Sequence, residues 1–187
     1  RQVSLHFECG TTEEDTAWTV DDGGDCSYTI HYKTKYACKD PNNTNPSTPA
    51  PAPAPAPVPV GGSCKYTNSV NGITYNFNTI KNKNFEITAS DGYTYSLNIC
   101  GTSPTECPND PDGVTSGMVT QTKPSPFGGV CYVLGQYDDS VTTANWSPLA
   151  NEAGVALTLA NGSPSDCPEG TPRQVSLHLE CGTTEED

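Results

Sequence analysis

The sequence predicts an all-β domain, a disulfide-stapled flattened antiparallel β-barrel or sandwich, together with an extended polyproline II linker. Three observations lead to this fold class: short segments that alternate apolar and polar residues, turn signals between those segments, and 9 cysteines in 187 residues. The 17 prolines and 17 glycines favour turns and linkers over helices. No window shows a 3.6-residue hydrophobic period of useful length.

Each expected strand is a segment of period two, because side chains of a β-strand point alternately to its two faces. In chain order these segments are Tyr28–Tyr32, Ile73–Phe77, Phe85–Ile87, Tyr93–Ile99, Val155–Leu159 and Val175–Leu179. Turn dipeptides lie between them, at Gly23-Gly24, Asp91-Gly92, Asp112-Gly113, Gly128-Gly129 and Asn161-Gly162.

The two ends of the chain are almost the same sequence. Residues 1–15 read RQVSLHFECGTTEED and residues 173–187 read RQVSLHLECGTTEED, so the pair differs only at Phe7 and Leu179, with an offset of 172 residues. Chance does not produce such a match over 15 positions. The chain is therefore predicted to be slightly more than one period of a tandem array.

A change in composition separates the copies. Residues 39–63 are rich in Pro and Ala, and the Ala-Pro alternation from Pro49 to Pro59 favours a polyproline II rod, either a passive spacer or a ligand for a proline-binding partner. We expect 1–38 to be the C-terminal part of one domain, 39–63 the linker, and 64–187 the N-terminal and central part of the next. A copy of residues 16–38 beyond Asp187 would complete the second domain. Folding of 1–38 against 64–187 as one closed body would count against this organisation.

Charge excludes some classes of function. Lys and Arg number 9 against 22 Asp and Glu, a formal net charge of −13, so nucleic-acid binding by phosphate neutralisation is excluded and anionic membranes are unsuitable partners. No apolar run approaches the roughly 20 residues that span a bilayer. The acidic residues near the N-terminus and the segment Asn109–Gly113 lack the spacing of a calcium loop, and a solvated acidic surface is the preferred interpretation.

Catalytic chemistry has no sequence support. A nucleophile elbow, a metal-hydrolase histidine pair and a phosphate-binding glycine loop are all missing, so we expect no enzyme, no catalytic residue and no cofactor. Zinc is the rival explanation for the cysteines, but there is no Cys-x-x-Cys pair and the three histidines fall on strand-like segments, so no metal is expected. Disulfides in an oxidising, extracellular or luminal setting are the preferred explanation.

Covalent glycans are expected instead. Asn42, Asn145 and Asn161 begin N-glycosylation sequons, the last two closely followed by proline. The Ala-Pro run is similar to the hydroxyproline glycomodules of plant and algal wall glycoproteins, although an unmodified rod stays open. The positions that could carry O-linked glycans are Thr44, Ser47, Thr48, Pro49, Pro51, Pro53, Pro55 and Pro57.

The order of several segments resembles the mannose 6-phosphate receptor homology (MRH) domain. These segments are Tyr93–Gly101, Gly129–Gly135, Val155–Gly162, Cys167, Arg173–Cys181 and Cys26–Cys38. The resemblance covers the chain outside the linker. For the eight cysteines of one domain, which alone allow 105 pairings, it implies Cys64–Cys100, Cys107–Cys131, fifth with seventh, and sixth with eighth. Within this chain that predicts Cys9–Cys38 and places the partners of Cys26, Cys167 and Cys181 outside the chain.

The resemblance also implies a carbohydrate site. Lectins of this family bind mannose with Gln, Arg, Glu and Tyr. Arg173, and its copy Arg1, stand at the arginine position and Tyr28 at the tyrosine position, while Asp22 stands near the glutamate position and Tyr132 replaces the glutamine. Weak or absent mannose binding is expected, and purely structural roles for Arg173 and Tyr28 are the alternative.

Two hypotheses of function follow. The first is a structural subunit of a secreted, glycosylated tandem-repeat extracellular fibre or surface filament, in which neighbouring copies are the partners, joined as one polypeptide or by strand donation. The alternative is a multivalent mannose-type glycan-binding lectin or sorting-receptor ectodomain, in which weak sites gain avidity.

Overall fold

The computed structural model describes residues 18–38, 64–69, 71–90, 92–126, 129–136, 144–150 and 154–181. The strands are β1 (Trp18–Asp22), β2 (Ser27–Thr34), β3 (Lys65–Thr67), β4 (Thr74–Asn76), β5 (Asn84–Thr88), β6 (Thr94–Asn98), β7 (Val119–Lys123), β8 (Val130–Gln136), β9 (Ala144–Pro148), β10 (Gly154–Asn161) and β11 (Gln174–Cys181). Two short 3-10 helices, η1 (Lys35–Ala37) and η3 (Pro168–Gly170), complete the described elements. The whole of the expected linker, residues 39–63, lies outside the described residues.

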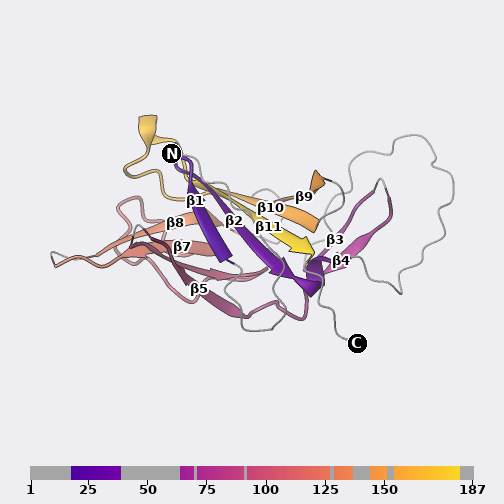
Figure 1. Cartoon of the computed structure of the whole chain (residues 1–187). Coiled ribbons are helices and arrows are strands. Elements are labelled where there is room, and N and C mark those ends of the chain that lie inside the picture. Colours follow the sequence, from indigo (N-terminus) through magenta and orange to yellow (C-terminus); the bar gives the residue numbers. More distant parts are fainter. Residues whose placement is uncertain are drawn as a thin grey trace.

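One curled, mixed sheet dominates the molecule (Figure 1). Its strand order is β1-β2-β11-β10-β8-β7-β6-β5, with β9 paired to β10, while β3 and β4 form a separate hairpin. Most of β10 pairs with β11, but Ala160 and Asn161 pair with β8, so β10 joins the two halves of the curl. The all-β class is confirmed.

The sheet differs from the expected antiparallel barrel or sandwich. β11 lies parallel to β2, with a register that runs from Gln174 opposite Ser27 to Cys181 opposite Thr34. A tight hairpin can join only antiparallel strands, whereas β2 and β11 are far apart in sequence and carry no such constraint. The result is a mixed half-barrel in which the β1–β2 hairpin and the β10–β11 hairpin meet along one parallel pair.

Alternation explains which strands were predictable. The six expected segments correspond to β2, β4, β5, β6, β10 and β11. In β11, Val175, Leu177 and Leu179 are fully buried while the residues between them are exposed or half-buried. β7 was not predicted, because it buries the polar Thr120 and Gln121, and neither side chain carries an apolar signal.

Residues 18–38 and 64–181 form one body, which corrects the expected division between them. β2 is hydrogen-bonded between β1 and β11, and two disulfides tie the segment 18–38 to the rest of the sheet. The segment thus takes the place that the sequence assigned to a copy beyond Asp187. The physical reason is that the free edge of β11 exposes unpaired backbone groups, which the chain's own β2 satisfies.

Four disulfides staple this body. Cys64–Cys100 and Cys107–Cys131 have the pairing that the resemblance implies. The expected Cys9–Cys38 bridge is replaced by Cys38–Cys181, and Cys26 bonds Cys167, so these three cysteines do find partners within the chain. Cys181 is the repeat equivalent of Cys9, which lies outside the described residues.

The bridges bear on the setting in which the chain folds. Four disulfides in a chain of this size indicate an oxidising compartment, because cytosolic thiols are kept reduced. Cys26–Cys167 and Cys38–Cys181 span 141 and 143 residues, so each closes a long loop in the unfolded chain. Among the described residues, no helix has the length and apolar character needed to cross a bilayer.

Candidate functional site

Arg173 is the centre of the candidate site. It lies directly before β11 and is only 4% exposed. Its Nη1 donates hydrogen bonds to the backbone carbonyls of Ser163, at 2.8 Å, and Ser165. The guanidinium also lies over the ring of Tyr132, with Cζ 3.9 Å from the ring centroid. Its Nε is a buried donor that has no hydrogen-bond partner among the described residues.

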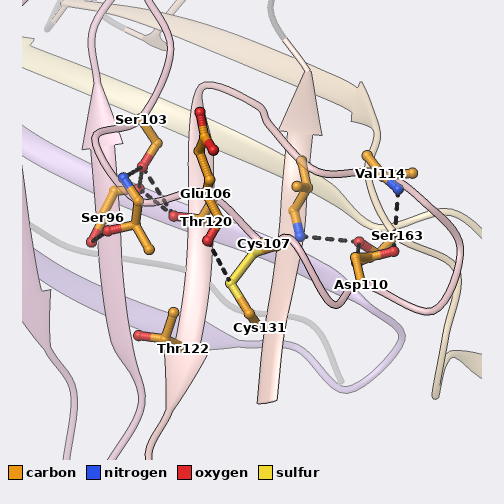
Figure 2. The surroundings of a disulfide bond; sticks show 12 residues. Ser96, Ser103, Glu106, Cys107, Asp110, Val114, Thr120, Thr122, Cys131 and Ser163 are labelled. Atoms are coloured by element: carbon orange, nitrogen blue, oxygen red, sulfur yellow. Dashed lines mark hydrogen bonds between the residues drawn. A yellow bond between two sulfur atoms is a disulfide. The ribbon is translucent and has the colours of Figure 1, made fainter. Parts of the chain in front are cut away.

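The loop that accepts from Arg173 is itself fixed. Ser163 donates its hydroxyl proton to Asp110 and accepts from the Val133 backbone N–H at 3.0 Å. The Ser165 backbone N–H donates to Asp112 at 2.8 Å. Figure 2 shows the Asp110–Ser163 contact near the Cys107–Cys131 bridge, which ties the loop around Asp110 to β8.

The environment of Asp110 corrects part of the sequence interpretation. Asn109–Gly113 was expected to be solvated acidic surface, but Asp110 is only 7% exposed. Its carboxylate also accepts the backbone N–H of Asp112 at 2.9 Å. Asp110 therefore organises the loop that holds Arg173, since a buried carboxylate requires hydrogen-bond donors.

Two tyrosines flank the arginine. Tyr132 lies on β8 and donates its hydroxyl proton to Asp166. Burial raises the pKa of Tyr132 to about 12, assisted by the hydrogen bond and charge of Asp166 and opposed by Arg173. Burial likewise raises the pKa of Tyr28, against the hydrogen bond and charge of Arg173. Both phenols therefore stay protonated at neutral pH and can act as hydrogen-bond donors.

Asp22 lies beside this group at the end of β1. It stands directly opposite Tyr28 in the β1–β2 register, and its charge acts to raise the pKa of Tyr28. Its Oδ1 accepts the Gly24 N–H at 3.1 Å. Thus Arg173, Tyr28, Tyr132 and Asp22, which the sequence proposed from distant positions, form one linked group. Arg1 lies outside the described residues.

Gln121 belongs to the same group, although the sequence did not assign it. It stands opposite Tyr132 in the β7–β8 register. Its Nε2 donates to the Tyr95 hydroxyl at 2.9 Å, and its Oε1 lies 3.5 Å from the Tyr28 hydroxyl. A buried amide therefore faces Tyr132, the residue at the position for which the MRH resemblance implied a glutamine. The signal was hidden because β7 itself was not predicted, so its register with β8 could not be read.

The group has the composition of a polar recognition site. An arginine donor, an amide, two phenols and an aromatic ring surface are the groups that read hydroxyls and oxygen acceptors of small polar ligands. The hydrogen bonds of Arg173 that are described go to backbone carbonyls, an arrangement that fits the structural role considered from the sequence as well as a recognition role.

A second cluster, of two histidines and a glutamate, joins residues that the sequence did not bring together. His31 on β2 and His178 on β11 are direct register partners, and Glu180 follows on the same face of β11. Burial lowers the pKa of His178. One potential ligand atom from each of the three residues lies within 4.8 Å of the others. Only the register of the parallel pair could have revealed the cluster.

The structure describes only two of the proposed glycosylation positions. Asn161 is exposed at the end of β10, and Asn145 lies in β9. Asn42 and all the proposed O-glycosylation positions, from Thr44 to Pro57, lie outside the described residues.

Comparison with protein-family models, with curated proteins and with solved structures finds no match to this chain.

Proposed function

We propose that the protein is a structural subunit of a secreted, glycosylated tandem-repeat fibre or surface filament, built from MRH-like β modules whose partners are neighbouring copies. The observation that carries this proposal is that the chain holds two near-identical copies of one strand, while the described sheet has a single position for it, between β10 and β2.

The position of β11 relative to β1 supports a continuous array. Leu179 of β11 and Trp18 of β1 are both register partners of Tyr32, so β11 ends at the end of the sheet where β1 begins. The two strands flank β2, a separation of about 10 Å at the usual spacing of strands. The eight residues 10–17 separate the first copy of the strand from Trp18, and fully extended they would span about 26 Å.

This spacing has a direct consequence for a longer chain. A copy of 16–38 placed after residue 187 would follow β11 at the same interval and would lie in the same module. Residues 2–9 could equally fill the position of β11, since Val3, Leu5 and Phe7 correspond to the buried Val175, Leu177 and Leu179. Each module of an array would then consist of consecutive residues of one chain.

Closure of 18–38 onto 64–181 changes the argument for a fibre. A single copy needs no neighbour to complete its sheet, so incomplete ends no longer support assembly. Separate chains would have to exchange the segment 18–38, which is a recognised route by which closed units become oligomers. The proposal therefore rests on the redundant strand and on the repeat.

Electron microscopy of chains with one, two and three periods tests the proposal. We expect particles whose length increases by one constant step per added period, because modules and linkers alternate. The control is a two-period chain of the same length in which a flexible Gly-Ser linker replaces the Pro- and Ala-rich linker of the second period. We expect this chain to lose the regular spacing. Compact particles without a constant increment would contradict the fibre.

Glycan recognition is the second candidate, favoured by the buried Nε of Arg173, which has no hydrogen-bond partner among the described residues and lies in one group with two tyrosines and Gln121. Titration calorimetry with mannose and with mannose 6-phosphate tests it. Tyr28→Phe should weaken any binding by removing a donor hydroxyl, whereas Tyr66→Phe, outside the group, should not. Absence of saturation at millimolar sugar, or equal binding by both variants, would contradict glycan recognition by this group.

A further inference from the structure

The parallel pair β2–β11 places two histidines and a glutamate together on one face. His31 and His178 are direct partners in the register, and their ring centroids are 4.4 Å apart. Nδ1 of His31 lies 2.9 Å from Oε1 of Glu180. Since 178 and 180 are two positions apart on a strand, both side chains leave β11 on the same side.

This face is opposite the hydrophobic core. Ile30 of β2 and Leu177 and Leu179 of β11 are fully buried in the core cluster, so the residues that alternate with them point the other way. His31 is buried, whereas His178 and Glu180 on β11 are both half-buried. The His31 side chain is 6% exposed and that of Glu180 is 21% exposed, so an ion would approach from the Glu180 side.

We propose that His31, His178 and Glu180 form a binding site for a divalent transition-metal ion, with Zn²⁺ as the best fit. Zn²⁺ binds imidazole nitrogen and carboxylate oxygen at about 2.0–2.2 Å, which places tetrahedral ligand atoms about 3.4 Å apart. Here the potential ligand atoms all lie within 4.8 Å of one another, and two of them are already at hydrogen-bond distance. Small side-chain movements would bring them to coordination distance.

The donor set selects among metals. Imidazole nitrogens suit Zn²⁺ and Cu²⁺, whereas Ca²⁺ and Mg²⁺ require oxygen ligands. Three protein ligands leave one position of a tetrahedral ion for water. The net charge of −13 attracts cations, while Lys33, the register partner of Glu180, acts in the opposite direction. We therefore expect a weaker site than a closed cysteine-ligated one.

The location of the site gives it a structural consequence. His31 belongs to the segment 18–38, and the other two ligands belong to β11, so a bound ion would link the segments that the sheet joins. The repeat preserves this possibility, because His6 and Glu8 correspond to His178 and Glu180. Either copy of the strand would supply the same two ligands. The metal site does not depend on the fibre proposal.

Titration calorimetry of the full chain with Zn²⁺, after treatment with a chelator, tests the proposal. We expect one equivalent to bind and the melting temperature to rise with Zn²⁺ concentration. His178→Gln and Glu180→Gln should each weaken binding by at least about tenfold, the effect that even an outer-shell partner has. The control is Glu86→Gln, since Glu86 is exposed on β5 and should leave the affinity unchanged.

Two further measurements keep the proposal falsifiable. His31→Gln changes a buried side chain and can unfold the chain, so the two β11 variants carry the test. Co²⁺ in place of Zn²⁺ should give the visible absorption of a tetrahedral ion, and His178→Gln should abolish it. Lack of saturable Zn²⁺ binding up to about 1 mM, or wild-type affinity in His178→Gln, would overturn the site. Neither outcome bears on the fibre proposal, because the particle lengths that test the fibre are measured without metal.

Discussion

Arg173 shows how much of this fold depends on single polar side chains. The buried guanidinium joins the loop at Ser163 and Ser165 to the ring of Tyr132. Such an arrangement uses the planar fork of arginine, which lysine lacks. Removing a buried hydrogen-bond partner leaves carbonyls unsatisfied, which costs about 1–3 kcal/mol.

Arg173→Lys should therefore lower the free energy of unfolding by about 1–3 kcal/mol, measured by guanidinium chloride denaturation with the disulfides intact. Lys123→Gln is the matched control. Lys123 also lies over an aromatic ring, with Nζ 4.4 Å from the Tyr93 centroid, but it is only half-buried, so we expect a change within about 0.5 kcal/mol. Equal effects of the two substitutions would contradict the role given to Arg173.

Tyr132 predicts a stability change at alkaline pH. Its folded pKa of about 12 exceeds the ordinary value of 10.0, so the folded chain holds the proton more tightly than the unfolded chain. This contribution to stability is complete below pH 10.0 and is lost as the pH rises toward about 12. Tyr132→Phe should reduce the decline in unfolding free energy between pH 10.0 and about pH 12. An unchanged decline in the Tyr132→Phe variant would contradict the role of Tyr132 in the pH dependence of stability.

At the scale of the element, alternation of apolar and polar residues in the sequence predicted β2, β10 and β11, and in β11 the side chains also alternate between core and outer face. It did not predict β8, whose apolar residues form a nearly continuous run that is buried on both sides. Pairing was also beyond the sequence, since the parallel contact of β2 with β11 joins segments that no turn connects.

The same limit applies to the candidate site. Arg173, Tyr28 and Asp22 were found through the MRH resemblance, which fixes positions along the chain. Gln121 and the His31–His178 pair were not found, because strand register alone makes them neighbours. Register depends on long-range packing, which periodicity does not encode.

β11 offers a test of strand interchange. The copy at residues 1–15 has Phe7 where β11 has Leu179, so both must fit if either copy can fill the position. Leu179 is fully buried, but its register partner Tyr32 is only half-buried, so the space around position 179 is less completely enclosed than that around Leu177. We expect Leu179→Phe to change the free energy of unfolding by less than about 1 kcal/mol, measured by denaturant unfolding.

Leu177→Phe is the control for that substitution. Leu177 stands opposite Ile30, and both side chains are fully buried. Added volume there should cost about 1–3 kcal/mol. If Leu179→Phe proved as costly as Leu177→Phe, residues 2–9 could not replace β11 without loss, and the redundancy argument for an array would fail.

At the scale of the whole molecule, the segment 18–38 and the body 64–181 form one sheet held by two disulfides. The MRH resemblance implied a fifth-with-seventh and sixth-with-eighth pattern, and Cys26–Cys167 and Cys38–Cys181 have that pattern. It assigned the partners to other copies, because order along the chain does not show that a linker can return 18–38 to the same body. The pairing of 18–38 with 64–181 depends on contacts between distant segments, which no single segment of the sequence reveals.

Peptide mapping of the single chain under non-reducing conditions tests this closure most directly. The two copies differ only at Phe7 and Leu179, so the peptides that contain Cys9 and Cys181 have different masses. The structure predicts that Cys38 is linked to the peptide that contains Leu179 and Cys181, and that Cys26 is linked to Cys167. A Cys38 linked to the phenylalanine-containing peptide would contradict the arrangement of β2 beside β11.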